Sequence, residues 1–387
     1  MPVFGSLLVI VFLVNFGRIV FAPLLDPFIR VFGVGEATVG LVATLAWLGS
    51  AVPRLPTGYL LTRVPRHYVI LGTGVVLAGA AAFTATAETI TQVGIGAFVI
   101  GISSGAYLIA ANPLISELFP DRVGRVIGIH GTAAQMAAVV APLTVGAVIA
   151  RLSWRAVFVF LAGMAVVATA ALFLAARRTE LPDPGRGKQH LRRSIAKQWP
   201  IVLTAIAVMG ATGFVWNGFF NFYVRYLTTT KGISFGLAQT MLTLVFAAGV
   251  PAFFYTGRLA DRLPHVSLML SILGSFVLTL LVMTVVEGLA ALVVVSIAMG
   301  YVIHSLFPTV DTYLLDSLPD EDRSSAYSAY SATMMTIGAG ASVVVGTLVE
   351  GGFAFDVVYR WFAVVLIVVF LVLVGLWRTN RLPDAAR

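Results

Sequence analysis

Five ionisable side chains lie inside stretches of the sequence that are otherwise apolar. They are Arg18, Asp26, Arg54, His304 and Asp311. A charged group away from water costs free energy, so ionisable residues in such stretches are candidates for function. An arginine suits the binding of an anionic group, and a histidine or a carboxylate suits proton exchange.

Arg18 and Asp26 belong to the first apolar stretch, and their spacing argues against a direct pair. On a helix, eight residues separate two side chains by about 12 Å along the axis and about 80° around it. Pro23 also bends the helix between them. Arg18, near the middle of the stretch, is a candidate for substrate binding together with Asn15, or for neutralising a carboxylate. Asp26 is a candidate for proton coupling, and the alternative is a carboxylate at the membrane interface.

The segment "MGYVIHSLFPTVDTYLLD" carries His304 and Asp311 on one helical face, about two turns apart. Histidine titrates near neutral pH, so His304 is a candidate for proton coupling and for substrate binding. The alternative is a buried histidine that donates to a backbone carbonyl. Asp311 is the third candidate for proton coupling.

The segment "FVWNGFFNFYVRY" places two amides on one face beside aromatic rings. Trp216, Asn217 and Asn221 are candidates for binding a moderately amphipathic organic solute. The alternative is that the amides form hydrogen bonds between helices, which stabilise membrane bundles by roughly 0.6–2 kcal/mol each.

These residues must be positioned by membrane-spanning helices. The chain has 387 residues, of which 59% are hydrophobic and 11% charged, and its mean hydropathy is +0.96. A soluble domain has about a quarter of its residues charged. The composition predicts an all-α polytopic membrane protein. The chain contains no Cys, which excludes disulfides and thiolate metal sites.

Apolar runs between polar breaks predict twelve spanning helices in two sets of six. The expected domains are an N-terminal bundle at 1–176, a basic cytoplasmic linker at 177–198, a C-terminal bundle at 199–377 and a tail at 378–387. The predicted spans are 4–29, 37–61, 68–86, 92–116, 126–149, 155–176, 200–223, 236–256, 266–286, 289–314, 325–348 and 360–377.

The distribution of basic residues predicts the orientation of these spans. With the N-terminus in the cytoplasm, seventeen Lys and Arg residues fall inside and six outside. Cytoplasmic loops carry an excess of such residues, so we expect both termini in the cytoplasm and a multi-pass protein of the cytoplasmic membrane. The same distribution explains the basic isoelectric point without nucleic acid as a partner.

Two loops recur at an offset of 199 residues. The segment "GYLLTRVPRH" after the second span matches "GRLADRLPH" after the eighth, with Gly58 against Gly257 and Arg63 against Arg262. The same offset aligns "FPD" ending at Asp121 with the "LPD" after the tenth span. The halves are therefore predicted to be pseudo-symmetric repeats, as in secondary transporters with a midplane site.

Six plus six helices, the basic central loop and the duplicated loop resemble the major facilitator superfamily over nearly the whole chain. The resemblance implies a transporter that works by alternating access. It also implies a conformational latch or gate made by Gly58, Thr62, Arg63, Arg54, Gly257, Asp261 and Arg262. Thr62 replaces the usual Asp in the first loop, so it can cap a helix but supplies no charge. Asp261 keeps that charge, which places the expected stronger latch in the second half.

The fifth span, "GTAAQMAAVVAPLTVGA", resembles the Gly- and Pro-rich motif of antiporters in this family. Pro142 and Gly146 are in place, whereas Ala137, Ala141 and Val145 stand where Gly is expected. The alternative is ordinary close packing of small residues. The motif favours efflux by antiport.

We therefore expect a secondary active transporter, proton-coupled and without cofactor or metal, that moves a small solute as a functional monomer in the bilayer. The alternative is an uptake carrier for an organic or inorganic anion bound by Arg18 and Arg54, because Arg54 resembles the arginine of nitrate porters in the second span. A membrane-embedded enzyme is the other class. It is disfavoured because His304 and Asp311 are too far apart for a direct dyad, and no nucleotide-binding loop motif occurs.

Overall fold

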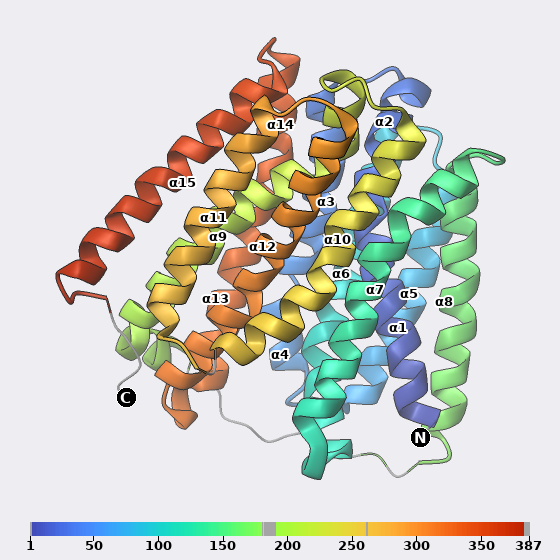
Figure 1. The fold of residues 1–387 in the computed structure, drawn as a ribbon. Helices are drawn as coiled ribbons and strands as arrows, with labels where there is room; N and C mark the ends of the chain where they lie inside the picture. The colour runs from blue at the N-terminus through green and yellow to red at the C-terminus, as the bar shows by residue number, and fades with distance from the viewer. Residues whose placement is uncertain (1, 180, 182–190, 261, 383–387) are drawn as a thin grey trace. The chain divides into compact units, whose positions relative to one another are not determined.

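The computed structural model describes residues 2–179, 181, 191–260 and 262–382, with the side chains of 191–196, 315, 320–325 and 328 left undescribed. Regular structure in the described ranges is helical (Figure 1). The helices are α1 (Pro2–Ile19), α2 (Phe21–Phe32), α3 (Glu36–Ala51), α4 (Arg54–Leu60), α5 (Arg66–Ala85), α6 (Ile90–Leu118), η1 (Pro120–Arg122), α7 (Val123–Ile149), α8 (Arg155–Ala176), α9 (Leu191–Thr229), α10 (Phe235–Ala260), α11 (His265–Val285), α12 (Leu289–Ser317), α13 (Asp320–Ala339), α14 (Ala341–Glu350) and α15 (Phe355–Arg378).

Within the described residues, twelve helical segments are long and apolar enough to cross a membrane. The first joins α1 and α2 into Pro2–Phe32, and the last is α15. This confirms the prediction of an all-helical protein with twelve spans. The predicted start of the last span, residue 360, was five residues late, since Asp356 and Arg360 lie inside the first turns of α15.

Prolines explain most breaks within spans. The first span is interrupted at Val20 between α1 and α2. Pro23 lacks an N–H and its ring crowds the carbonyl four residues earlier, which is that of Ile19. Pro53 separates α3 from α4 for the same reason. In α9 the backbone is non-helical at Gln198, just before Pro200.

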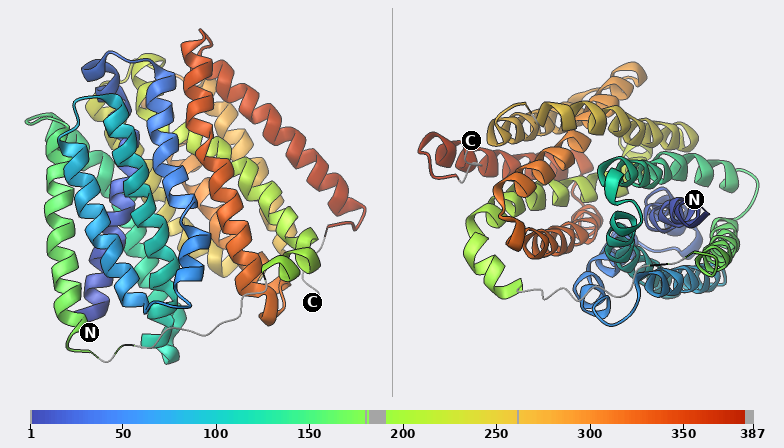
Figure 2. Two further views of the ribbon diagram at one scale, coloured as in Figure 1. Left: turned by 180° about the vertical axis from the view of Figure 1, so that it is seen from behind. Right: turned by 90° about the horizontal axis from the view of Figure 1, so that it is seen from below.

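The chain divides into two compact units, Met1–Lys188 and Gln189–Arg387. In the first unit α1 is the central helix and packs against α2, α5, α6, α7 and α8, as the end-on view in Figure 2 shows. In the second unit α9 is central and contacts α10 to α15. Each unit therefore buries its first long helix inside a ring of the others.

The repeat predicted from the loops extends to the helices. Both α6 and α12 have 29 residues, and α12 starts 199 residues after α6. The same offset separates the starts of α3 and α10 and those of α5 and α11. Two polar contacts also match. Arg66 of α5 lies 2.8 Å from Glu117 of α6, and His265 of α11 lies 3.2 Å from Asp316 of α12.

A close helix crossing is repeated too. A Cβ added to Gly101 of α6 would collide with the carbonyl oxygen of Ala46 in α3. A Cβ on Gly300 of α12 would collide with that of Val245 in α10, and both residues lie 199 positions later. Small residues let two helix backbones approach closely. In both units this crossing fixes the side chains around it, including the candidate site residues.

Candidate functional site

Arg18 lies in the last turn of α1, just before the break at Val20, and its side chain is held by three neutral groups. Its Nη1 donates to Ser50 Oγ at 3.2 Å, and its Nη2 donates to Asn15 Oδ1 at 2.9 Å. The guanidinium carbon lies 4.2 Å from the ring centroid of Trp47. Only 8% of Arg18 is exposed. The guanidinium is thus buried between α1 and α3.

Its partners are themselves fixed. Asn15 Nδ2 donates to the Val11 carbonyl at 2.8 Å, which turns its Oδ1 toward Arg18. Ser50 lies at the crossing of α3 with α6, where a Cβ on Gly105 would meet the Ser50 carbonyl. Arg18 is therefore held by a preorganised surrounding.

Arg54 reaches the same serine. Its Nε donates to the Ser50 carbonyl at 3.3 Å, whereas Arg18 uses the Ser50 hydroxyl. The structure thus gathers Asn15, Arg18 and Arg54 around Ser50. Sequence reasoning missed Ser50 and Trp47, although these two residues are spaced by three on α3, which places them on one helix face.

Asp26 is separate from this cluster. It lies in α2, 2.7 Å from the guanidinium of Arg30 one turn later, and the Arg30 side chain is 61% exposed. This agrees with the expectation that Arg18 and Asp26 do not pair.

His304 of α12 is surrounded by aromatic rings. Its Nδ1 lies 2.7 Å from the Gly300 carbonyl, so Nδ1 carries the proton and Nε2 is the acceptor of the neutral ring. Its ring centroid is 5.6 Å from Trp216 and 5.9 Å from Phe246. Phe253 and Phe307 each lie at 6.1 Å. The backbone hydrogen bond is the alternative considered for this residue, and it leaves one ring nitrogen for other chemistry.

The two side-chain amides of α9 form different hydrogen bonds. Asn221 Nδ2 donates to the Asn217 carbonyl at 2.8 Å and to Ser342 Oγ of α14 at 3.0 Å. Asn217 Nδ2 donates to the Gly213 carbonyl at 2.8 Å, while its Oδ1 is buried without a hydrogen-bond partner. Asn221 thus joins helices, and Asn217 keeps an unused acceptor.

Asp311 of α12 is contacted by another helix rather than by His304. The hydroxyl of Tyr327, in α13, donates to Asp311 Oδ1 at 3.2 Å. Among the described residues no cation pairs with this carboxylate.

The expected latch residues lie at helix ends. Arg63 contacts the Tyr59 hydroxyl and stacks over the Tyr59 ring with its guanidinium carbon 4.8 Å from the centroid. Thr62 donates to the Tyr59 carbonyl at 2.8 Å, and Pro65 occupies the N-cap of α5. Thr62 therefore closes α4 instead of capping α5.

The remaining motif residues are placed as follows. Gly58 lies in α4, Gly257 lies near the end of α10, and Arg262 is exposed just beyond that helix. Asp261 lies outside the described residues. Pro142 and Gly146 lie in α7, which continues as one helix through Pro142.

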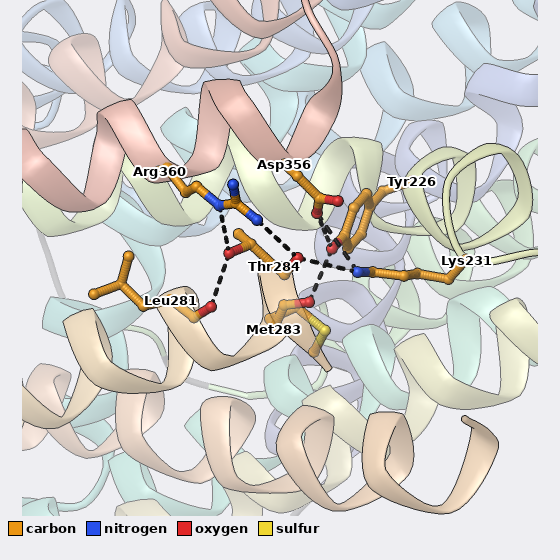
Figure 3. Close-up of polar contacts among 7 residues, drawn as sticks. All are labelled: Tyr226, Lys231, Leu281, Met283, Thr284, Asp356 and Arg360. Atoms are coloured by element: carbon orange, nitrogen blue, oxygen red, sulfur yellow. Dashed lines mark hydrogen bonds and ion pairs between the residues drawn. The ribbon is translucent and has the colours of Figure 1, made fainter. Parts of the chain in front are cut away.

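A separate polar cluster in the second unit joins the ends of several helices (Figure 3). Lys231 Nζ lies 3.6 Å from Asp356 Oδ1 and donates to the Thr284 carbonyl at 3.3 Å. Arg360 Nε donates to Thr284 Oγ1 at 3.1 Å, and the Tyr226 hydroxyl lies 2.6 Å from Asp356. These contacts cap the last carbonyls of α11 with cations from α15 and from the α9–α10 connection. The cluster joins helix ends.

A membrane protein with twelve helical spans in two repeated units, and with polar residues buried in those spans, has the architecture of a secondary transporter. The sequence profile of the Major Facilitator Superfamily matches residues 7–340 and 211–387, and the chain belongs to this family. Membership confirms the resemblance and the transporter class. It also shows that the chain is not an enzyme.

Two bacterial relatives carry the name "Multidrug resistance protein MdtG". The protein from Serratia proteamaculans is 25% identical over 380 residues, which are 94% of this chain and 90% of that protein. The protein from Salmonella choleraesuis is 24% identical over 352 residues, which are 87% of this chain and 86% of that protein.

Solved structures share the fold at lower identity. A bacterial homologue of the human lysosomal transporter Spinster, inward-facing and occupied, has a TM-score of 0.81 at 16% identity, covering 98% of this chain and 96% of that one. A mutant of the nucleoside transporter NupG has a TM-score of 0.79 at 15% identity, covering 96% and 99%. These likenesses show the fold alone.

Proposed function

We propose that this chain exports small organic solutes across the bacterial cytoplasmic membrane by alternating access, in exchange for protons. The multidrug-resistance name of the MdtG relatives and the antiporter-like motif of α7 support export. The basic residues of the loops support a cytoplasmic position for both termini. The transporter acts as a monomer.

Asp311 is the observation that carries proton coupling. It lies in a membrane-spanning helix, and its described hydrogen bond comes from the neutral Tyr327 hydroxyl. In a membrane span, a carboxylate that the described residues do not pair with a cation is costly mainly while it is charged. Binding and release of a proton therefore change the free energy of burying this side chain, which links protonation to conformation.

The other two candidates have partners that oppose such a change. Asp26 lies 2.7 Å from the Arg30 guanidinium, near the end of its span. His304 is bonded to the Gly300 carbonyl and packed among four aromatic rings, which suits a role in contacting the apolar part of a solute. We assign the proton to Asp311 and the aromatic contacts to the group around His304.

Inverted membrane vesicles with an imposed proton gradient test this assignment. Three probes share one ring system: naphthalene sulfonate, the neutral naphthalene sulfonamide and naphthylmethylammonium. Export appears as accumulation of a probe inside the vesicles. Asp311→Asn keeps the size and the hydrogen-bond acceptor but cannot ionise, so we expect gradient-driven accumulation to fall at least tenfold while exchange without a gradient persists.

Asp316→Asn is the matched control, because Asp316 lies at the end of the same helix with its side chain 56% exposed. It should retain gradient-driven accumulation. If Asp311→Asn accumulated the probes as well as the unmodified chain, Asp311 would not be the coupling residue.

A second candidate function is uptake of an anion, favoured by the two arginines at Ser50. The same vesicles separate the two directions. Under an imposed gradient, accumulation in inverted vesicles indicates export, and accumulation in right-side-out vesicles indicates uptake.

A further inference from the structure

The guanidinium of Arg18 is a buried cation without a counter-charge in the described part of the first unit. Its described contacts are a hydroxyl, an amide oxygen and an indole ring, and its Nε has no hydrogen-bond partner. Arg54, a second cation, binds the backbone of the same Ser50. The described contacts of Arg18 therefore solvate its positive charge but do not neutralise it.

Two half-buried cations in the described part of the chain lie beside carboxylates. Arg66 lies 2.8 Å from Glu117, and Lys231 lies 3.6 Å from Asp356. Isolating an ion from water costs several kcal/mol even after relaxation, and neutral hydrogen bonds recover only part of that cost. A protein that keeps such an arrangement at Arg18 gains by binding an anion there.

The geometry also indicates the kind of anion. Trp47 covers one face of the guanidinium, while Asn15 and Ser50 each take one N–H. The unused donors, Nε–H among them, lie in the guanidinium plane, where a planar or trigonal oxyanion is bound by two parallel hydrogen bonds.

We propose that the transported solute carries an oxyanion group, such as a carboxylate, sulfonate or phosphonate, and that Arg18 binds this group. The inference rests on the proposed transport function and narrows its substrates to organic anions. Solutes with a single positive charge are repelled by Arg18 and Arg54, so the chain discriminates against lipophilic cations.

Binding of the three naphthalene probes to the purified full chain tests the charge preference without transport. We expect the sulfonate to bind at least tenfold more tightly than the sulfonamide, and the ammonium to bind more weakly than either. Arg18→Gln should abolish the difference between sulfonate and sulfonamide, and Arg18→Lys should retain part of it. Equal binding of the two probes by the unmodified chain would overturn the proposal.

Arg151→Gln is the matched control, since Arg151 is an exposed arginine of the same unit in the α7–α8 connection. It should leave the preference for the sulfonate unchanged. An equal loss in Arg151→Gln and Arg18→Gln would mean that net charge, rather than Arg18, determines binding.

Stability without ligand gives an independent readout. Removing an uncompensated buried charge should leave the melting temperature of Arg18→Gln unchanged or raised, because functional sites commonly sacrifice stability. The sulfonate should raise the melting temperature of the unmodified chain and not that of Arg18→Gln. A lowered melting temperature of ligand-free Arg18→Gln would assign Arg18 a structural role and contradict the proposal.

The binding and vesicle results separate this inference from the proposed function. If the sulfonate binds through Arg18 but is not moved under a gradient, proton-coupled export fails and the anion site stands. If Arg18→Gln exports the sulfonate as well as the unmodified chain does, export stands and the anion site fails.

Discussion

At the scale of residues, Arg18 and Asn221 show how differently two buried polar groups of the spans are used. The Asn221 amide donates to the Asn217 carbonyl within α9 and to Ser342 Oγ of α14. Its hydrogen bond to Ser342 holds α9 against α14. Arg18 keeps an unused donor and an uncompensated charge. Of the two, Arg18 has the capacity to bind a solute.

Asn221→Ala is therefore expected to reduce stability more than transport. The lost hydrogen bond to Ser342 should lower the free energy of unfolding by about 1 kcal/mol. Ser342→Ala should cost a similar amount, and the double variant less than the sum, because both changes remove one contact. Unfolding in mixed detergent micelles measures the three values. Fully additive losses would show that the two side chains do not interact.

Part of this residue-level arrangement is predictable from the sequence. The separation of Arg18 from Asp26 follows from helix geometry and Pro23. The contacts of Arg18 with Ser50 and Trp47 do not, because they depend on how close α3 comes to its neighbours. That approach is set by glycines in a different helix, α6. No local sequence pattern predicts which helix these glycines will face.

At the scale of elements, the repeated crossing at Gly101 and Gly300 is the feature that positions both groups of site residues. In each unit the obstacle to a larger residue is a backbone carbonyl, which cannot rotate away as a side chain does. The crossing therefore tolerates no Cβ without moving a helix.

Gly101→Ala and Gly300→Ala should each lower the free energy of unfolding by about 1–3 kcal/mol, since overpacking displaces a helix. Gly163→Ala is the control, because a Cβ there meets nothing within 4 Å. It should be neutral or stabilising by up to about 1 kcal/mol, as alanine favours helix over glycine. Mixed-micelle unfolding compares the three, and a Gly101→Ala chain as stable as Gly163→Ala would contradict the crossing.

The elements themselves are largely predictable. Apolar runs of membrane length predict the twelve spans, and the loop repeat predicts their pairing at an offset of 199. The breaks within the spans are less predictable. Pro23 and Pro200 predict a break in the helix. The division of the eleventh span into α13 and α14 at Gly340 has no proline nearby that would predict it.

At the scale of the whole molecule, the orientation in the membrane stays a prediction from the basic residues. The chain has no cysteine, so single introduced cysteines report sidedness without a background. Glu88 and Thr379 are exposed residues in a connection and at the end of α15, respectively.

A membrane-impermeant maleimide should label Glu88→Cys in intact spheroplasts and should label Thr379→Cys only after the membrane is opened. This follows from the excess of Lys and Arg in the loops assigned to the cytoplasm. The opposite pattern would reverse the orientation, and the direction of transport in inverted vesicles would then be reinterpreted.

The repeated crossing has a consequence for the ancestry of the chain. One turn beyond Gly101 the first copy has Gly105 facing Ser50, and 199 residues later the second copy has His304 and Gly249. The side chain and the glycine that faces it have changed helices, while the glycine that sets the crossing has stayed. After duplication of a six-helix ancestor, side-chain volume could thus move from one helix of this crossing to the other. The two halves could then diverge in chemistry while the backbone crossing stayed the same. Selection against a larger side chain should therefore act at 101 and at 300 alike, whichever chemistry each half has acquired beside the crossing.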